Sequence, residues 1–435
     1  MTQVEVRRSA RVGSALTIIV AALSLVPACT GSDASTASVT STSSTTSTTV
    51  DAPSAARPAE AITRDGDTYR IPATTEPVAP GQLVASQALA PSAALGGARR
   101  TLLLYGTTDA QGAPTVASGV VLAPARTPPP GGWPVVSWAH GTVGVADGCA
   151  PSQTDNLAYN EYAQEVRSFL DAGYAVVATD DVGLGTPGIH PYLDGMSEGA
   201  ATVDIVPASH RAVTGLAPDW FAVGHSQGGQ AVLFANRIAA TRAPGYPLRA
   251  TISIAPASHL ELLVPAVASG DRPADFVYAL YAIVGLSAAD PTVELEPLLG
   301  PEGDARVDLI TDDGCLIDTG EAFAGVAAAD AFAIDDAAME RISEGLARIG
   351  NPDTAPTSGP VLILQGATDA DVPAEFSAAV AERLRALGSD VTYREYPDLG
   401  HDEVLGPSMC EQLAFLAAHG GPTVSDCIPQ PTDLS

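Results

Sequence analysis

Short apolar runs rich in β-branched residues alternate with stretches of helical period along most of the chain after residue 98. Runs of this length and composition are typical of buried strands. The strands predicted in this way cover residues 99–108, 115–124, 133–141, 174–180, 220–226, 249–256, 359–366 and 390–397. Asp and Gly in residues 109–112 predict a turn that joins the first two strands.

Between the strands, apolar residues recur at spacings of three and four, the period of an amphipathic helix. Tyr162, Val166 and Phe169, for example, share one face of a predicted helix. The predicted helices cover residues 160–173, 199–216, 227–242, 373–388 and 409–420. Pro207 predicts a kink or a break in the second of them, because proline removes a helical hydrogen bond.

Strands that alternate with helices predict an α/β fold, with a mainly parallel central sheet and helices on both faces. Residues 259–351 interrupt this rhythm, because they are rich in Ala, Leu and Asp, mostly helical in pattern and without a clear strand. We expect them to form an inserted helical cap. The core would then consist of residues 61–258 and 352–435.

The first 60 residues have the pattern of a leader and a tether. Arg7, Arg8 and Arg11 precede an apolar run that ends at Cys29, which predicts a signal peptide over residues 1–28. Two readings stay open: cleavage near residue 28 and free secretion, or a bacterial lipoprotein lipidated at Cys29. Both place the protein outside the cytoplasm, secreted or at the cell surface. The Ser/Thr-rich residues 29–60 predict a disordered tether.

The composition and net charge of the chain limit the classes of partner that it can bind. The chain of 435 residues has 46% hydrophobic and 16% charged residues, enough apolar material for a sizeable core. Its formal net charge of −29 would repel phosphate backbones, which argues against nucleic acid as a partner. The same charge disfavours electrostatic docking on anionic lipid, so membrane contact would come only through an N-terminal lipid anchor. Nothing in the sequence indicates an oligomeric state.

Four cysteines follow Cys29, at positions 149, 315, 410 and 427. An even number in an oxidising compartment predicts two disulfides, and four cysteines allow three connectivities. No cysteine or histidine pair has the spacing of a zinc site, so the sequence predicts no metal.

A candidate catalytic motif, Gly224-His225-Ser226-Gln227-Gly228, lies between a predicted strand and a predicted helix. A serine between glycines at such a turn is typical of a nucleophile elbow, in which a strained turn lifts the hydroxyl out of the sheet. The alternative is a glycine-rich turn that happens to contain a serine. The strand–turn–helix context favours Ser226 as a nucleophile.

A serine nucleophile needs a base and an acid, which follow it along the chain in this arrangement. His401 lies in a loop between a strand and a helix, whereas His419 ends a helix, where capping explains it. Asp369 follows the strand 359–366 closely, and Asp371 has the alternative role of a charge at a helix N-terminus. Asp398 and Asp402, which flank the histidine, are expected to be solvated or capping carboxylates. We therefore predict Asp369 as the acid and His401 as the base.

The tetrahedral intermediate of acyl transfer requires N–H donors directed at its oxyanion. The amide of Gln227, directly after the nucleophile, is one expected donor. The other is expected from the loop after the strand 133–141, at His140, Gly141 and Thr142. His140 is interpreted as a packed or hydrogen-bonded loop residue, not as the base.

Five blocks of the sequence resemble, in this order, the secretory lipase family, whose members include yeast lipases of the lipase A type. The blocks are SWAHGTVGVADGCAPS, DDVGLGTPGIHPYL, GHSQGGQAVLFA, GATDADVP and GHDEV. The resemblance covers roughly residues 90–427. It implies an α/β-hydrolase core, a helical cap after the sixth core strand and hydrolysis of carboxylic esters without a cofactor.

The resemblance also implies roles for particular residues. Carried over, Ser226 is the nucleophile, Asp369 the acid and His401 the base. The same resemblance implies the disulfides Cys149–Cys315 and Cys410–Cys427. Asp180 and Asp181 are expected to be structural or to lie near the substrate.

The sequence thus predicts an extracytoplasmic lipase or esterase that acts on triacylglycerols or other lipid or small acyl esters through an acyl-enzyme. An acyltransferase would use the same triad and is not separated from a hydrolase by the sequence. A prolyl-type serine peptidase shares the elbow and the chain order, although such enzymes usually need a propeller domain or a pocket for a peptide N-terminus. A non-catalytic binding module is disfavoured, because all three triad members stand in order.

Overall fold

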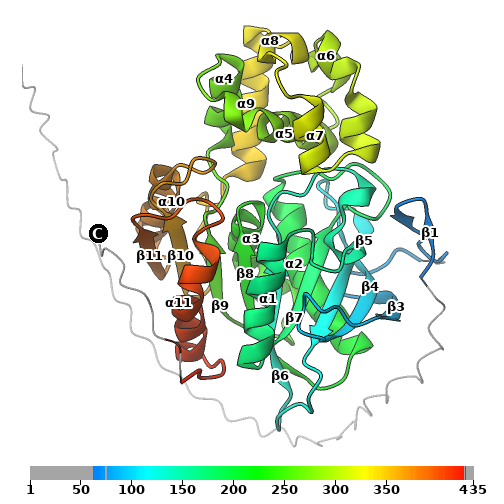
Figure 1. The fold of residues 1–435 in the computed structure, drawn as a ribbon, viewed down its shortest axis with the longest axis vertical. Coiled ribbons are helices and arrows are strands. Elements are labelled where there is room, and N and C mark those ends of the chain that lie inside the picture. Colours follow the sequence, from blue (N-terminus) through cyan, green and yellow to red (C-terminus); the bar gives the residue numbers. More distant parts are fainter. Residues whose placement is uncertain (1–61, 74–75, 426, 428–435) are drawn as a thin grey trace, which may run out of the picture. The chain divides into compact units, whose positions relative to one another are not determined.

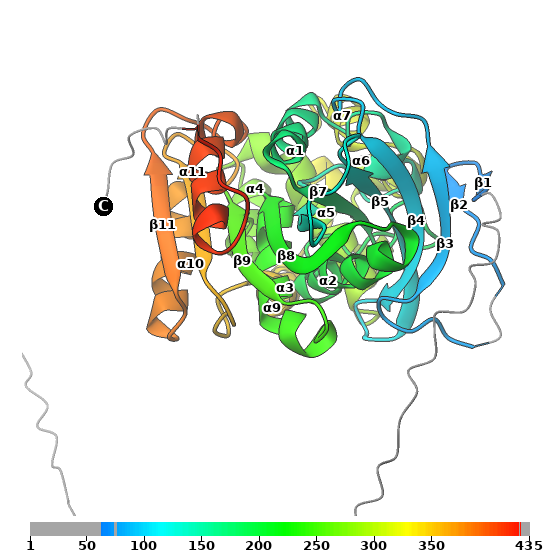
Figure 2. The same cartoon turned by 90° about the horizontal axis from the view of Figure 1, so that it is seen from below.

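The computed structural model describes residues 62–73, 76–425 and 427, so the predicted signal peptide, Cys29 and the predicted tether lie outside the described residues. The described chain is built on a nine-stranded sheet of order β11-β10-β9-β8-β6-β7-β5-β4-β3 (Figure 2). Its strands are β3 Leu83–Leu89, β4 Arg99–Thr108, β5 Pro114–Ala123, β6 Trp133–Ala139, β7 Ala175–Asp181, β8 Leu216–His225, β9 Leu248–Ile254, β10 Val361–Gly366 and β11 Val391–Tyr396. A short hairpin, β1 Arg64–Asp65 and β2 Thr68–Tyr69, forms a separate two-stranded sheet.

The sheet is mainly parallel, as the sequence predicts. Neighbouring strands run parallel from β7 through β6, β8, β9 and β10 to β11. The strands β3, β4 and β5 are antiparallel, and β5 also pairs antiparallel with β7. The sequence pattern missed β3, because its residues LVASQAL are mostly half-buried at the sheet edge and neither alternate nor form a continuous apolar run.

Helices cover both faces of the sheet (Figure 1), which confirms the second part of the fold prediction. One face packs against α1 (Asn160–Ala172) and α11 (Leu405–Ala418). The other packs against α2 (Gly195–Ala212), α3 (Gln227–Arg242) and α10 (Ala374–Ala386). Adjacent residues of a strand therefore serve different cores, as the two-residue period of a strand requires.

Helix α2 differs from the helix predicted over residues 199–216 in three respects, the first being that it ends at Ala212, since Leu216 already belongs to β8. It begins earlier, at Gly195, because the Asp194 side chain caps it by accepting the Ser197 N–H at 2.8 Å. It also continues through Pro207 instead of ending there. Burial against the sheet explains this, since α2 is almost entirely buried and its packing outweighs one lost helical hydrogen bond.

Between β9 and β10 the described chain forms helices and no named strand. These are α4 Leu260–Ala268, α5 Phe276–Ala289, α6 Pro301–Asp304, α7 Leu316–Ala322, α8 Ala328–Ala331 and α9 Asp336–Gly350. We call them the helical layer; Figure 1 shows them gathered beyond one end of the sheet strands. The layer has its own apolar core around α5 and α9. Its extent as a domain, residues 259–351, stays a prediction. Over the described ranges, no helix combines the length and apolar character that a membrane span needs.

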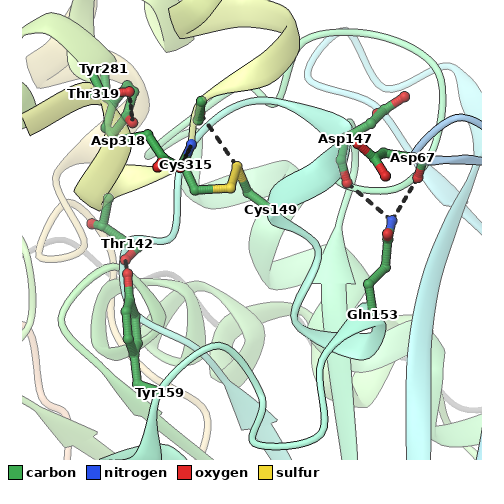
Figure 3. Close-up of a disulfide and its surroundings, with 11 residues drawn as sticks. Asp67, Thr142, Asp147, Cys149, Gln153, Tyr159, Tyr281, Cys315, Asp318 and Thr319 are labelled. Carbon is green, nitrogen blue, oxygen red and sulfur yellow. Dashed lines mark hydrogen bonds between the residues drawn. A yellow bond between two sulfur atoms is a disulfide. The ribbon is translucent and has the colours of Figure 1, made fainter. Parts of the chain in front are cut away.

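Two disulfides are present, Cys149–Cys315 and Cys410–Cys427, the pairing that the resemblance implies. The first joins the loop after β6 to the start of α7 (Figure 3). Beside it, the Leu316 N–H donates to the Val143 carbonyl at 2.8 Å. The helical layer is therefore bonded to a loop of the sheet at this point.

Candidate active site

Ser226 occupies the sharp turn between β8 and α3. Its backbone has φ 58° and ψ −116°, a conformation with positive φ that costs a non-glycine residue roughly 1–3 kcal/mol. The surrounding backbone holds it there: its N–H donates to the Ile254 carbonyl at 2.8 Å, and its carbonyl accepts the N–H of Ala257 at 3.1 Å. The turn places Ser226 at the carboxyl end of the parallel strands and at the N-terminus of α3.

Two glycines make room for this turn. A Cβ on Gly224 would overlap the carbonyl oxygen of Gly228, and a Cβ on Gly228 would overlap the carbonyl oxygen of Ala139. These backbone segments cannot separate easily, because Gly224 and Ala139 are register partners in the paired strands β8 and β6. Close packing thus explains why glycines stand two residues before and after Ser226.

The loops after β10 and β11 bring a carboxylate and an imidazole together. His401 Nδ1 lies 2.7 Å from Asp369 Oδ2. The same carboxylate accepts the backbone N–H groups of Asp371 and Val372 at 2.9 and 2.8 Å and the Gln365 side-chain amide at 2.8 Å. Since these bonds fix Asp369 as an acceptor, the imidazole proton lies on Nδ1, and Nε2 is left with its lone pair.

The alternative residues do not join this pair. Asp371 contributes its backbone N–H to Asp369 rather than its carboxylate to a histidine. His419 lies at the end of α11, with Nδ1 2.8 Å from the Phe415 carbonyl. Asp398 and Asp402 are exposed. The geometry therefore agrees with the choice of Asp369 and His401, whose catalytic roles stay predictions.

Ser226 and His401 line one cavity, together with His225, Tyr162 and Asp402. Within the described part of the chain, no hydrogen bond joins the Ser226 hydroxyl to His401. Bonds of this kind are often long before substrate binds, so the shared cavity is the relevant observation.

The loop after β6 lies directly against the serine. A Cβ built on Gly141 would be 3.3 Å from Ser226 Cβ. The Gly141 N–H already donates to the Tyr162 hydroxyl at 3.1 Å. By contrast, no hydrogen bond of the described residues uses the N–H of Thr142 or of Gln227. The Thr142 carbonyl accepts the Tyr159 hydroxyl at 2.9 Å (Figure 3), which orients this peptide. Thr142 and Gln227 are thus better suited than Gly141 to donate to an oxyanion.

His140 has a structural environment. It is 1% exposed, and its Nδ1–H donates to the Gly141 carbonyl at 2.7 Å. Burial lowers the pKa of His140 to about 4, so the ring is neutral at ordinary pH. Of the predicted loop residues, His140 therefore fits an expected packing role and supplies no charge to an oxyanion.

The sequence model of one hydrolase family, described as "Serine aminopeptidase, S33", matches residues 156–406, more than half of the chain. The chain belongs to this family. No curated protein matches the sequence.

Solved structures resemble this S33-family chain in fold. Candida antarctica lipase A has 20% sequence identity and a TM-score of 0.65, with 81% of this chain and 86% of that chain covered. The rice cell wall degrading esterase LipA from Xanthomonas oryzae has 22% identity and a TM-score of 0.61, with 75% and 93% covered. A hydrolase structure from Legionella pneumophila, whose assignment there is itself provisional, has 19% identity and a TM-score of 0.65, with 79% and 100% covered. These likenesses confirm the α/β-hydrolase fold.

In this S33-family hydrolase, two opposing influences act on the imidazole of His401. Burial lowers its pKa, but the hydrogen bond to Asp369 and the charges of Asp369, Asp371 and Asp402 outweigh burial, so the pKa of His401 is raised above its ordinary 6.5. The neighbouring His225 ring is buried, and burial together with His401 holds the pKa of His225 well below 6.5. A neutral His225 adds no positive charge beside His401.

We expect Asp402→Asn to move the acid limb of the pH–rate profile to lower pH. A general base acts only when neutral, so activity falls as the pH drops through the raised pKa of His401. Removing the Asp402 charge lowers that pKa, because this carboxylate stabilises the imidazolium. The measurement is kcat/KM against pH for both proteins. The exposed Asp65→Asn serves as the matched control, and an acid limb that stays in place or rises in Asp402→Asn contradicts the account.

Two cavities meet at Ser226. The first, here the apolar cavity, has an empty volume of about 600 Å³. Its apolar lining comprises Leu193, Ala257, Leu260, Leu262, Leu263, Val372, Pro373 and Phe376. The second, here the histidine-side cavity, has an empty volume of about 540 Å³ and contains His401 with several polar side chains. These are Thr142, Tyr159, Glu161, Tyr162, Tyr278 and Asp402.

Sequence reasoning missed a buried polar cluster behind Gln227. Its side-chain amide donates to Glu198 Oε1 at 2.8 Å and to His190 Nε2 at 2.7 Å. The His190 Nδ1–H in turn donates to the Val182 carbonyl at 2.8 Å. Burial raises the pKa of Glu198 well above 4.5. The cluster immobilises the residue that follows Ser226. A glutamate inside the otherwise apolar, small-residue stretch of α2 was the available signal.

Proposed function

We propose that this chain hydrolyses carboxylic esters outside the cytoplasm, through Ser226 as nucleophile, His401 as base and Asp369 as the acid that orients His401, without a cofactor. The observation that carries the proposal is the placement of Ser226, at positive φ on a strand–helix turn, in one cavity with a histidine whose Nδ1 is bonded to a buried carboxylate. This is the arrangement that activates a serine hydroxyl.

The steps follow from the geometry. Ser226 attacks the ester carbonyl while His401 Nε2 takes the hydroxyl proton, and Asp369 stabilises the imidazolium that forms. The free N–H groups of Gln227 and Thr142 bind the oxyanion. His401 then gives its proton to the leaving alcohol. Water, deprotonated by His401, then attacks the acyl carbon, the bond from this carbon to Ser226 Oγ breaks, and His401 returns the proton to Ser226 as the acid leaves.

The two cavities have different parts in this reaction. Because His401 must reach the leaving oxygen, the alcohol lies in the cavity that contains His401. The acyl group then lies in the apolar cavity, which contains Ser226 but not His401. The lining of that cavity suits a hydrocarbon chain, whose burial gains roughly 0.8 kcal/mol per CH₂. We infer that the substrate is an ester of an apolar acid.

The helical layer has the role of a cap in this proposal. Leu260, Leu262 and Leu263 of α4 line the apolar cavity, and Leu316 of α7 lines the histidine-side cavity. Residues 259–351 would therefore set the acyl chains that fit and control entry to Ser226.

The description of the family favours a second candidate, an aminopeptidase. In that reaction the residue with the free N-terminus is the acyl part, so its ammonium group would lie in the apolar cavity beside Ser226. Among the residues that line this cavity, Asp371 is the one carboxylate, and the guanidinium of Arg272 lines it too. Asp371 and Arg272, which is itself paired with Asp275, place charges of opposite sign beside the cavity, and the other side chains offer an ammonium group no charge. The geometry therefore favours the ester.

The test compares p-nitrophenyl esters from acetate to palmitate with p-nitroanilides of amino acids, proline included. We expect ester hydrolysis with kcat/KM at least about 100-fold above that of any amino-acid anilide, on the scale of differences that an unsuitable pocket causes. Faster cleavage of an anilide with a free amino group would reverse the assignment. Transfer of the acyl group to added glycerol in preference to water would instead identify an acyltransferase.

Export is the part of the proposal that rests on residues outside the structure. The apolar run before Cys29 supports a leader, and the two disulfides are suited to an oxidising compartment. Lipidation of Cys29 would anchor the protein, whereas cleavage without lipidation would free it; the mass of the mature N-terminus separates the two.

A further inference from the structure

Three hydrogen bonds join residues from four different parts of the site. The Gly141 N–H lies 3.1 Å from the Tyr162 hydroxyl, the Tyr162 hydroxyl lies 3.1 Å from His225 Nδ1, and His225 Nε2 lies 3.1 Å from the His401 carbonyl oxygen. We call these four residues the positioning chain. Gly141 follows β6, Tyr162 lies on α1, His225 ends β8, and His401 follows β11.

The direction of every bond in the positioning chain follows from its two ends. A backbone N–H can only donate, so the Tyr162 oxygen accepts from Gly141. A carbonyl oxygen can only accept, so His225 Nε2 carries a proton and donates it to His401. A neutral His225 then has a bare Nδ1, which accepts the Tyr162 hydroxyl proton. Each group uses a different atom for each bond, so the chain is complete.

The side chains of the positioning chain are buried, and Tyr162 and His225 form part of the wall of the histidine-side cavity. His225 is 1% exposed and Tyr162 is 4% exposed. The Tyr162 ring is packed edge-on against Trp138 at 5.4 Å and against His225 at 5.8 Å between ring centroids. The His225 ring lies 4.6 Å from the His401 ring. Losing one bond of such a buried network costs more than losing one at the surface.

We propose that Tyr162 and His225 are positioning residues: the chain holds the backbone of the base His401 and the loop that contains Thr142 in register with Ser226. His225 is adjacent to Ser226 in sequence, so the turn, the base and the oxyanion loop are tied to one ring. The inference rests on the proposed function, because it assigns His401 as the base. It assigns a reason for a histidine directly before the nucleophile.

Burial keeps the bond directions constant. The pKa of His225 lies well below 6.5, so the ring stays neutral over the pH range in which His401 changes charge. The bond to His401 also occupies His225 Nε2. His225, His401 and Asp402 are a group of described residues whose ligand atoms lie within 4.8 Å of one another. A proton on His225 Nε2 leaves no lone pair there for a metal ion, so the geometry favours the positioning role.

The first test reads the tautomer of His225 in the ¹⁵N-labelled full-length protein. Long-range ¹H–¹⁵N correlation distinguishes a protonated Nε2 from a protonated Nδ1, and the signals missing in His225→Gln identify the ring. We expect the Nε2–H tautomer at neutral pH. A protonated Nδ1 would overturn the chain, because the bond to the His401 carbonyl would then lack its hydrogen. This measurement requires no enzyme assay, so its result is independent of whether the protein hydrolyses esters.

The second test separates the two hydrogen bonds of His225 by means of two substitutions at this position. Gln reaches about as far as Nε2 and keeps a donor for the His401 carbonyl, whereas Asn reaches only to the place of Nδ1 and loses that donor. We expect His225→Asn to lose roughly tenfold or more in kcat and His225→Gln to stay within about threefold of the parent, on the scale of one buried hydrogen bond. Equal losses in both variants would overturn the role of the bond to His401.

The third test removes the Tyr162 hydroxyl, the central group of the positioning chain. Tyr162→Phe deletes the hydroxyl that bonds to both Gly141 and His225, and we expect kcat to fall roughly tenfold. Tyr174→Phe is the matched control, because Tyr174 is buried in the same apolar core and its hydroxyl has no partner among the described residues. Thermal unfolding shows whether each variant folds. Unchanged kcat in a folded Tyr162→Phe protein would overturn the proposal; loss of ester hydrolysis in the parent protein would instead reject the proposed function.

Discussion

Ser226→Ala is expected to lower ester hydrolysis by more than about 10⁴-fold, the scale on which loss of a triad nucleophile acts. Among the described residues, Ser226 is the one serine that lines both cavities. The fold should be unaffected, since alanine keeps the Cβ and the hydrogen bonds of the turn involve the Ser226 backbone. The measurements are the steady-state rate on p-nitrophenyl esters, the amplitude of the acylation burst and the thermal unfolding midpoint.

Ser269→Ala supplies the control for Ser226→Ala. Ser269 is an exposed serine at the end of α4, and its hydroxyl bonds only to nearby groups of the same turn. It should retain parental activity. If Ser226→Ala folds and keeps even a tenth of the parental rate, Ser226 is not the nucleophile, and the proposed reaction would need another one.

Removing the disulfide Cys149–Cys315, with both cysteines changed to serine, is expected to cost about 2–5 kcal/mol of the free energy of unfolding. The disulfide closes a chain segment with a sequence separation of 166, so its loss greatly increases the freedom of the unfolded chain. Activity should fall as well. The disulfide (Figure 3) holds the loop that follows Thr142 against the helical layer, and the hydrogen bond from Leu316 to Val143 does the same. Denaturant unfolding and kcat together measure both effects.

The second disulfide is the internal comparison. Cys410–Cys427 has a sequence separation of only 17, and Cys410 lies in α11 (Figure 1). Chain entropy predicts that its removal costs about 2 kcal/mol less than removal of Cys149–Cys315. It should also leave kcat unchanged, since neither cysteine lines a cavity with Ser226. A larger activity loss from the Cys410–Cys427 pair would contradict the importance of the loop after β6.

Local patterns in the sequence were sufficient for the sheet and for the elbow. Most of the strands from β4 to β10 were predictable because they contain short apolar runs, and burial on both faces requires such runs, whereas the edge strand β11 was predicted from its β-branched and aromatic residues. Ser226 was predictable because backbone crowding at the turn admits only glycine at positions 224 and 228. Gly173, in the left-handed conformation with φ 103°, ends α1 where the sequence places it.

Features that depend on the partner element were less predictable. The edge strand β3 has a weak pattern because it is only half-buried. Pro207 predicted a kink or a break, and α2 continues through it without a break, because the packing of α2 against β4 and α3 outweighs the local preference. Glu198 reads as a surface helix residue until α2 buries it against Gln227.

The sequence by itself determined the order of Ser226, Asp369 and His401, because this order follows from the order of the strands. It also determined the glycines around Ser226, because they are a local requirement of the backbone. The position of Asp369 after its strand favoured it over Asp371 in the sequence, but only the loop conformation shows that the Asp369 carboxylate meets His401 while Asp371 supplies an N–H. The same holds for Tyr162 and His225. Their bonds join residues separated by 63 and 176 positions, and only the folded chain brings such distant groups within hydrogen-bond distance.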